Sequence, residues 1–416
     1  MKLIFFCYVF VVAIIFYSLF ILYKYIKFFK INNKNFDSYL NPDKGLFIAI
    51  PCLREQNVIE DTIKYFRKIC DVPIVIITTQ KENFEYKYNK KYVTTKIVVE
   101  KSILNRYKDV YLVDYPLTSG YMADQLNFMI SDLNKLSFYD ESKIWYMSLY
   151  NADSKPSKDS FKSIFYKINR DNEVIQQYSY CFKNMDKLSF ITKGFAIYQS
   201  NFEVKVGLFN SNLDYKYLYN YVVGHGLTIK LKTLKNMGNF NTVFWCEDIY
   251  LTMKLKFNNI KISPILELEN IENAASIKQI TKQNAVWYDT TKKYKLIYND
   301  IKKLSAKHSI FGVIGCLNEF RCAINWLLFP IVFLFNILIC LFNKSIILEI
   351  ILVFSYLFYS LINYFITIKT INKLNEGSYR LSISNYISYV VALFISNIGP
   401  LYSIFFKKKD KYKTER

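Results

Sequence analysis

Long apolar runs lie at the two ends of the chain, and short ones fill its middle. Leu3–Tyr23 has no charged residue and is long enough to cross the hydrocarbon of a membrane as a helix. Three further apolar runs follow residue 300, at Ala323–Phe342, Ile346–Ile368 and Tyr386–Phe406. We predict that the first two of these cross as helices. Gly399-Pro400 interrupts the third run, which favours a re-entrant or interfacial segment over a third crossing.

Lysines flank the first apolar run unequally. Only Lys2 precedes it, whereas four follow at once, at Lys24, Lys27, Lys30 and Lys34. The positive-inside rule therefore predicts an anchor at 1–24 and places the next part of the chain in the cytoplasm. A cleaved signal peptide would have a shorter apolar core and a small-residue cleavage site, and the sequence shows neither.

The middle of the chain alternates between short apolar runs and segments with helical spacing. The runs that predict strands are Leu46–Ile50, Pro73–Thr78, Val110–Val113, Ile144–Tyr150, Val174–Tyr180 and Leu227–Lys232. Such alternation is typical of an α/β sheet. We therefore expect a cytoplasmic α/β domain at 44–300, a connecting or interfacial helix at 301–322, membrane helices within 323–406 and a basic tail at 407–416.

Composition narrows the class of partner. Hydrophobic residues make up 52% of the chain although 21% is charged, so the apolar residues must be concentrated in segments. The net charge of +21 would suit nucleic acid, but with membrane spans it favours an anionic membrane surface instead. Eight cysteines without C-x-x-C pairs indicate reduced thiols, and two histidines are too few for a multi-histidine zinc site.

Acidic and amide side chains follow two of the predicted strands. The first strand leads into Pro51, with Glu55 opening a helix, and the fourth leads into Asn151-Ala152-Asp153. Ligands of such sheets bind beyond the carboxyl ends of the strands. Asn151 and Asp153 offer oxygen ligands for a divalent ion whose octahedron phosphate oxygens would complete. An Asx-turn or a helix cap is the structural alternative for the same residues.

Three further positions carry candidate chemistry. Glu247 and Asp248 begin a helix, where they could serve the helix dipole or accept a proton from a sugar hydroxyl. His225 stands between two glycines and could bind a phosphate or a sugar hydroxyl, or be structural. Gln283 and Trp287 share one face of a predicted helix, and Trp287 could anchor the chain at an interface or stack on a sugar ring.

The order of these residues along the chain resembles a known family. The pattern comprises Pro51 and Glu55, Gly120 with Ala123 and Leu126-Asn127, Asn151-Ala152-Asp153-Ser154, Gly226-Leu227, Gly238-Asn239-Phe240, Glu247-Asp248, Gln283 and Trp287. It resembles the family 2 inverting GT-A glycosyltransferases, of the membrane-bound type related to cellulose and hyaluronan synthases. The resemblance covers roughly residues 44–290.

The resemblance implies a nucleotide-diphospho-sugar transferase domain of the GT-A fold plus α-helical transmembrane segments. It assigns the nucleotide or donor to Pro51, Glu55, Thr78, Thr79, Asp124 and Gln283, and the acceptor to His225 and Trp287. It places Mg²⁺ or Mn²⁺ on Asp153 with Asn151. Asp248 would be the base that deprotonates the acceptor hydroxyl, with Glu247 beside it, and attack opposite the diphosphate would invert the anomeric carbon.

Three positions depart from the family pattern. Asn151 replaces the first acid of the metal motif, and Thr78-Thr79 stand where the family often has acids after the second strand. Val286 replaces the arginine of the Q-x-x-R-W motif, which removes a natural contact to the diphosphate.

The expected function is therefore a hexosyltransferase in the bacterial plasma membrane. It would move a sugar from a nucleotide donor, usually a UDP-sugar, to a polysaccharide or lipid-linked acceptor. A degenerate relative that binds sugar nucleotides without transfer is the main alternative. A transporter is a weaker alternative, because most of the predicted spans contain no ionisable residue. Glu349 is the exception. A glycoside hydrolase is another alternative. It would need neither a diphosphate nor a metal, so dependence on a divalent ion would separate it from a transferase.

Overall fold

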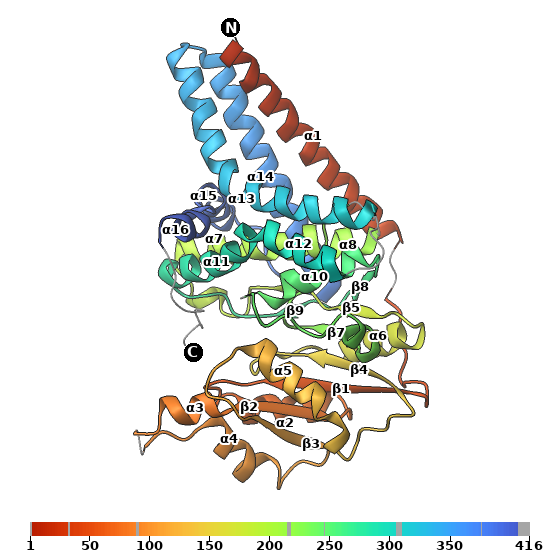
Figure 1. The fold of residues 1–416 in the computed structure, drawn as a ribbon. Helices are drawn as coiled ribbons and strands as arrows, with labels where there is room; N and C mark the ends of the chain where they lie inside the picture. Colours follow the sequence, from red (N-terminus) through yellow and green to blue (C-terminus); the bar gives the residue numbers. More distant parts are fainter. Residues whose placement is uncertain are drawn as a thin grey trace. The chain divides into compact units, whose positions relative to one another are not determined.

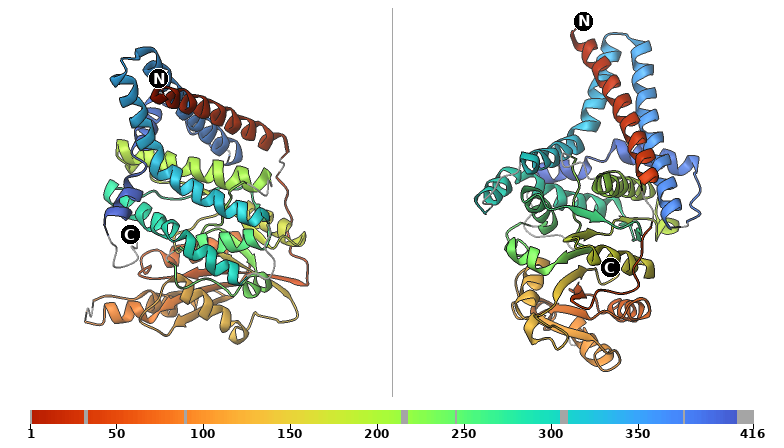
Figure 2. Two further views of the ribbon diagram at one scale, coloured as in Figure 1. Left: turned by 45° about the horizontal axis from the view of Figure 1, so that its top comes forward. Right: turned by 90° about the vertical axis from the view of Figure 1, so that its right-hand side faces the viewer.

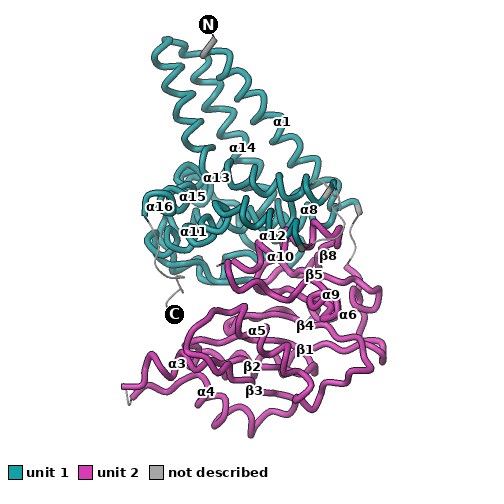
Figure 3. The backbone as a smooth tube through the Cα atoms, in the orientation of Figure 1, with its two compact units in different colours: residues 1–33, 179–220, 270–416 teal, residues 34–178, 221–269 magenta. Residues whose placement is uncertain are grey.

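The computed structural model describes residues 2–31, 34–88, 91–213, 218–244, 246–304, 310–375 and 377–406. The chain forms two compact units, shown in different colours in Figure 3. One contains residues 34–178 and 221–269, and the other contains 1–33, 179–220 and 270–416. The predicted basic tail at 407–416 lies outside the described residues.

A seven-stranded mixed sheet forms the centre of the first unit, with the strand order β3-β2-β1-β4-β7-β5-β8. Its strands are β1 (Lys44–Pro51), β2 (Ile74–Thr79), β3 (Val110–Tyr115), β4 (Ile144–Leu149), β5 (Val174–Gln176), β7 (Leu227–Lys230) and β8 (Ile262–Pro264). Strands β1 to β4 run parallel, whereas β7 is antiparallel to both of its neighbours. The sheet confirms the predicted α/β class.

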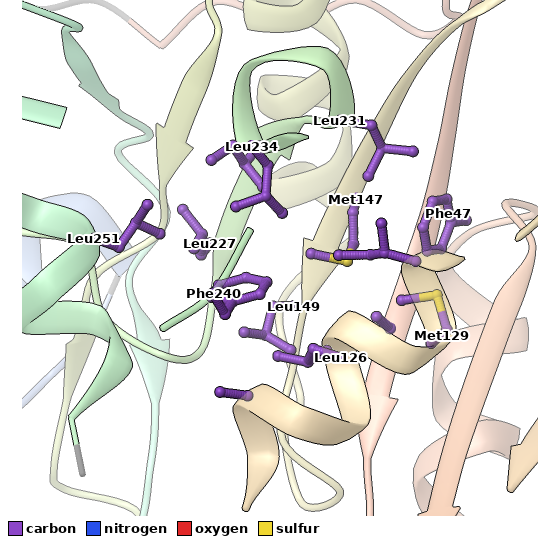
Figure 4. Close-up of a cluster of buried hydrophobic side chains, with 14 of the residues drawn as sticks. Phe47, Leu126, Met129, Met147, Leu149, Leu227, Leu231, Leu234, Phe240 and Leu251 are labelled. Atoms are coloured by element: carbon purple, nitrogen blue, oxygen red, sulfur yellow. The ribbon is translucent and has the colours of Figure 1, made fainter. Parts of the chain in front are cut away.

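Helices cover both faces of this sheet. They are α2 (Ile59–Ile69), α3 (Gln80–Glu85), α4 (Thr95–Val98), η1 (Val99–Ile103), α5 (Met122–Ser131), η2 (Leu133–Lys135), α6 (Lys158–Asn169), α9 (Leu231–Asn236) and α10 (Glu247–Phe257). Successive residues of β1 alternate between two cores, because strand side chains point to opposite faces. Phe47 packs with Leu126 and Met129 of α5 (Figure 4), whereas Ile48 packs with residues of α2 and α6.

Three long helices of the second unit pack side by side as a bundle (Figures 1 and 2): α1 (Lys2–Ile31), α13 (Ile310–Phe342) and α14 (Ile346–Asn375). Each contains a stretch long and apolar enough to cross a membrane. Helix α13 begins at Ile310, so it includes the end of the predicted connecting segment as well as the predicted span. Pro330 lies inside α13.

The third C-terminal run forms two short helices, α15 (Ile383–Phe394) and α16 (Ile398–Phe405). Taken as one stretch, Ile383–Phe405 is also long and apolar enough to span. Twelve and eight residues give helices of about 18 and 12 Å, however, and neither alone matches a hydrocarbon core of about 30 Å. The break precedes Pro400, which lies in the first turn of α16, where a missing N–H leaves no helical bond unmade.

Shorter helices complete the second unit: η3 (Met185–Lys187), α7 (Phe190–Phe202), η4 (Glu203–Leu208), α8 (Phe209–Leu213), α11 (Ile277–Lys292) and α12 (Tyr294–Leu304). Helix α15 packs on α7, and α16 packs on α11. Glycines permit both approaches: a Cβ at Gly194 would lie 2.1 Å from the carbonyl oxygen of Ser388, and one at Gly399 would lie 2.3 Å from Cβ of Asn284. Strands β6 (Ser179–Tyr180) and β9 (Glu269–Asn270) pair in a separate two-stranded sheet.

Candidate functional site

The two adjacent carboxylates at the start of α10 face a glycine-flanked turn. A Cβ at Gly224 would lie 3.6 Å from Oε1 of Glu247 and 3.9 Å from Oδ2 of Asp248. The same Cβ would lie 3.3 Å from Cε of Met122, at the start of α5. The absence of a side chain at Gly224 therefore leaves both carboxylates next to the backbone of the turn that carries His225.

Hydrogen bonds tie this turn to the end of β4. The backbone N–H of Gly226 donates to the carbonyl oxygen of Leu149 over 2.7 Å. Gly226 has φ +65°, and a Cβ there would lie 2.6 Å from the carbonyl oxygen of Gln177, so glycine is required. The side chain of Gln176 accepts from Val223 N–H and donates to the carbonyl of His225, at 3.0 and 2.9 Å. The turn is thereby fixed beside the strand that leads into Asn151.

Asn151 and Asp153 lie in a tight turn after β4. Ser154 donates its N–H to the carbonyl of Asn151 over 3.1 Å, and its hydroxyl oxygen accepts the N–H of Asn151 over 3.2 Å. Thr62 donates to the carbonyl of Ala152 over 2.6 Å and buries that residue. Asn151 and Asp153 on either side stay half-buried. The bonds that close this turn come from the backbone and from the Ser154 hydroxyl, and the role of Asn151 and Asp153 as ligands stays a prediction.

The donors of this turn fit a hard divalent cation only in part. An amide and a carboxylate supply the oxygen ligands that Mg²⁺ and Mn²⁺ accept, and Mg²⁺ in enzymes is commonly held by one or two carboxylates plus substrate phosphates. Within the described ranges, no group of three His, Cys, Asp or Glu side chains could hold a metal alone. The residues fit a metal that a bound diphosphate helps to coordinate.

Asp248 has a local backbone partner. Its Oδ1 accepts the N–H of Ile249 over 2.8 Å. The positive end of the helix dipole and this hydrogen bond both favour the ionised carboxylate. Glu247 is more deeply buried, with 5% of its surface exposed, whereas Asp248 is half-buried. Asp248 is therefore the more accessible of the two carboxylates.

The predicted nucleotide contacts have partners within the protein. Thr78 donates to Oδ1 of Asp114 over 2.8 Å, and Thr79 accepts the N–H of Lys81 over 3.2 Å. Oδ2 of Asp124 accepts the N–H of Tyr121, the residue before α5, over 2.7 Å. Glu55 is buried, and Pro51 ends β1. These positions lie at or near the carboxyl ends of the parallel strands, and their contacts with a nucleotide stay a prediction.

Sequence analysis missed a carboxylate that organises the loop after β1. Glu82 is 1% exposed and accepts four hydrogen bonds: from the N–H of Arg54 and of Thr95, from the Thr95 hydroxyl and from the Tyr92 hydroxyl. Arg54 has φ +59°, a conformation that a side chain disfavours. Burial and the charge of Glu82 both raise the pKa of Tyr92. A lone Glu in a polar stretch gives no sequence signal for such a role.

Asp114 is a second missed carboxylate, at the end of β3. It accepts hydrogen bonds from Thr78, from the amide of Gln80 and, over 2.9 Å, from Lys96. This ion pair raises the pKa of Lys96. An acid directly after the apolar run Val110–Val113 matches the strand-end rule, so the signal was present. The carboxylate of Asp114 thus accepts from three donors, and its bonds to Thr78 and Gln80 hold the chain at the end of β2 in place.

Gln283 and Trp287 belong to the other compact unit, and their part in the site stays a prediction. Both lie half-buried on α11. The same helix buries Val286, at 5% exposure, the position where the family pattern has an arginine.

No family model matches the chain, and no curated protein matches it significantly. Among solved structures it is similar to the mannosyltransferase PcManGT from Pyrobaculum calidifontis in complex with GDP-Man and Mn²⁺, with 10% identity and a TM-score of 0.49 over 96% of this chain and 99% of that one. It is also similar to S. aureus TarS 1-349, with 13% identity and a TM-score of 0.39 over 82% and 94%. Likenesses this distant carry no argument about the chemistry of the site.

Proposed function

We propose that the chain is a membrane-bound inverting glycosyltransferase that moves a sugar from a nucleotide-diphosphate donor to a glycan or lipid-linked acceptor. One observation supports this most: Glu247 and Asp248 face the turn that Gly226 ties to the end of β4, directly before Asn151 and Asp153. A general-base candidate and a metal-ligand candidate thus belong to adjoining segments at one sheet edge, as transfer from a diphosphate requires.

In the proposed reaction, Asp248 accepts the proton of an acceptor hydroxyl. The freed oxygen attacks the anomeric carbon from the face opposite the diphosphate, and the bond to the diphosphate oxygen breaks, so the configuration inverts. Asp153 and Asn151 would hold Mg²⁺ or Mn²⁺, which offsets the charge on the leaving diphosphate when bound. The buried Glu247 would support the orientation of the neighbouring turn and of Asp248.

The location is part of the proposal. Within the described residues, α1, α13 and α14 and the interrupted stretch Ile383–Phe405 are long and apolar enough to cross a membrane, which supports an integral membrane protein. The lysines after the first span favour a cytoplasmic sheet-containing unit, where nucleotide sugars are made. A bacterial plasma membrane and a UDP-sugar donor are our working assignments.

The test uses the full-length protein in lipid nanodiscs, with a panel of UDP- and GDP-sugars and Mg²⁺ or Mn²⁺. Release of nucleoside diphosphate that depends on the metal and on Asp248 is the expected result. Asp159→Asn is the control, because Asp159 also lies in the first turn of a helix, α6, where it pairs with Lys162 and is assigned no role in the proposed reaction. Donor binding without release in the presence of candidate acceptors would favour a sugar-nucleotide-binding relative, and no binding of any donor would reject the proposal.

A further inference from the structure

Two lysines are buried among neutral groups in the helical unit. Lys24 of α1 is 3% exposed, and Lys205 of η4 is 7% exposed. The ammonium of Lys24 donates to the carbonyl oxygen of Lys205 and to Oδ1 of Asn210, at 3.2 and 2.8 Å. The ammonium of Lys205 donates to Oδ1 of Asn363 and to the hydroxyl of Tyr359, at 3.0 and 3.4 Å. Since an ammonium has three N–H groups, each lysine retains one donor beyond these bonds.

A third cation joins them from α13. Arg321 lies on α13, which packs against α1, and its charge acts on Lys24 as that of Lys205 does. Arg321 is exposed and donates to Oδ1 of Asn318 over 3.0 Å. Among the described residues, no carboxylate forms an ion pair with any of the three. The buried carboxylate of Glu319 lies two residues before Arg321 on α13.

The neutral partners hold the cations without cancelling their charge. Amide oxygens and a phenol fix the two ammonium groups in place, and the rings of Tyr17 and Tyr359 lie 5.7 and 5.6 Å from the Lys205 ammonium. Burying a cation without a counter-charge is costly, and charged side chains within membrane segments are commonly functional. A site of basic side chains with neutral partners and one further donor per lysine suits an anion that comes from outside the protein.

The helices set the depth of this cluster. Lys24 lies about 20 residues from the start of the span at Ile4, and Arg321 about 21 residues from Phe342, which correspond to about 30 Å along each helix. Ile4 and Phe342 lie at the same end of the bundle, where the chain begins and where α13 turns into α14 (Figure 1). A hydrocarbon core of about 30 Å that begins at Ile4 and Phe342 would end near Lys24 and Arg321, which would put both side chains at the level of lipid headgroups.

We propose that Lys24, Lys205 and Arg321 form a binding site for the phosphate headgroup of a membrane lipid. Arginine suits a phosphate because its planar fork can bind two oxygens, and a lysine suits it as a point charge. The exposed Arg321 would contact the headgroup first, while the buried lysines supply charge and their remaining donors. The site lies in the helical unit and does not depend on the proposed sugar transfer.

The test measures lipid selectivity on the full-length protein by native mass spectrometry from mixed micelles. Phosphatidic acid, which has a phosphate monoester, competes against phosphatidylcholine for wild type and for Lys24→Gln, Lys205→Gln and Arg321→Gln. Lys30→Gln, on an exposed position of α1, and Lys344→Gln, at the other end of the bundle, are charge-matched controls. Thermal unfolding without added lipid checks each variant, and Arg321→Gln keeps the test decisive if a buried variant misfolds.

We expect the preference for phosphatidic acid to fall about tenfold or more in the three site variants, as for the loss of one charge-assisted hydrogen bond, and to persist in both controls. An equal fall in the controls would show general attraction of a basic protein to anionic lipid and would overturn the site. Unchanged preference in Arg321→Gln would overturn it as well. Full displacement of the lipid by millimolar inorganic phosphate would assign the site to free phosphate instead.

Discussion

Glu247 and Asp248 are adjacent carboxylates with different surroundings, and this difference predicts different effects of neutralising them. Asp248 is half-buried and accepts the N–H of Ile249 at the start of α10, so Asp248→Asn removes the proposed proton acceptor while keeping the shape of the side chain. We expect turnover to fall by roughly 10²–10⁴, the usual range for a general base, with donor affinity little changed. Glu247→Gln should cost less turnover, because this buried side chain would only support its neighbour.

The measurement is sugar transfer at saturating donor, with donor binding measured in parallel. Asp159→Asn serves as the control for removing an acid from the first turn of a helix. Near-normal turnover in Asp248→Asn would rule out the proposed base, whereas a loss of donor binding would make Asp248 part of the nucleotide site.

Substitutions of Asp153 and Asn151, in the same turn, should change the effect of Mg²⁺ on nucleotide binding in opposite directions. Asp153→Ala should abolish the enhancement of nucleotide binding by Mg²⁺, because it removes the only carboxylate of the predicted pair. Asn151→Asp should strengthen the enhancement, since it adds a charged ligand where the family pattern has one. Calorimetric titration with a nucleoside diphosphate, with and without Mg²⁺, measures the enhancement in both variants. Equal enhancement in wild type and Asp153→Ala would remove the metal site from this turn.

The contact between α7 and α15 tests packing at the scale of elements. Gly194→Ala would bring a Cβ to 2.1 Å from the carbonyl oxygen of Ser388, and backbone atoms on both helices would have to move. Overpacking of this kind typically costs about 1–3 kcal/mol of folding free energy. The thermal midpoint in detergent should therefore fall for Gly194→Ala, and it should change little for the neighbouring Lys193→Ala. An unchanged midpoint for Gly194→Ala would mean that the two helices pack less closely.

The elements also show how far the sequence could predict the fold. Apolar runs marked β1, β2, β3, β4 and β7 to within a few residues. The signal is strong because β1, β2, β4 and β7 are buried on both faces, whereas the edge strand β3 is only partly buried. The run Val174–Tyr180 splits into β5 and β6, since the side chains of Gln176 and Gln177 turn to bond the chain around His225 and Glu267. Residues 179–220 belong to the helical unit. The sequence could not predict this, because an amphipathic pattern shows that a helix has a buried face but not which element packs against that face.

The sequence offered candidate site residues where a strand end or a helix start marked them, and their roles stay predictions. Asn151, Asp153, Glu247 and Asp248 carried such marks. Glu82 and Lys205 did not, because their roles depend on groups distant in sequence, such as Arg54 for Glu82 and Asn363 for Lys205. A buried hydrogen-bond partner of this kind becomes visible only when the chain has folded.

At the scale of the whole molecule, the sequence predicts the orientation in the membrane. The fold provides exposed positions at which this orientation can be tested. The lysines after the first span predict that α1 ends in the cytoplasm, so the turn between α13 and α14 should lie outside, with the N-terminal end of α1. Lys344 is exposed in that turn, and Tyr88 is 88% exposed in the sheet-containing unit. The native cysteines disturb a labelling experiment little, because seven are buried and Cys322 is half-buried.

A membrane-impermeant maleimide applied to intact cells should therefore label Lys344→Cys and leave Tyr88→Cys unlabelled until the membrane is permeabilised. Lysed cells provide the control, since both variants should react there if both side chains are exposed. Labelling of Tyr88→Cys in intact cells would reverse the orientation. It would also separate the sheet-containing unit from cytoplasmic nucleotide sugars, so this one experiment tests the topology and a condition of the proposed transfer together.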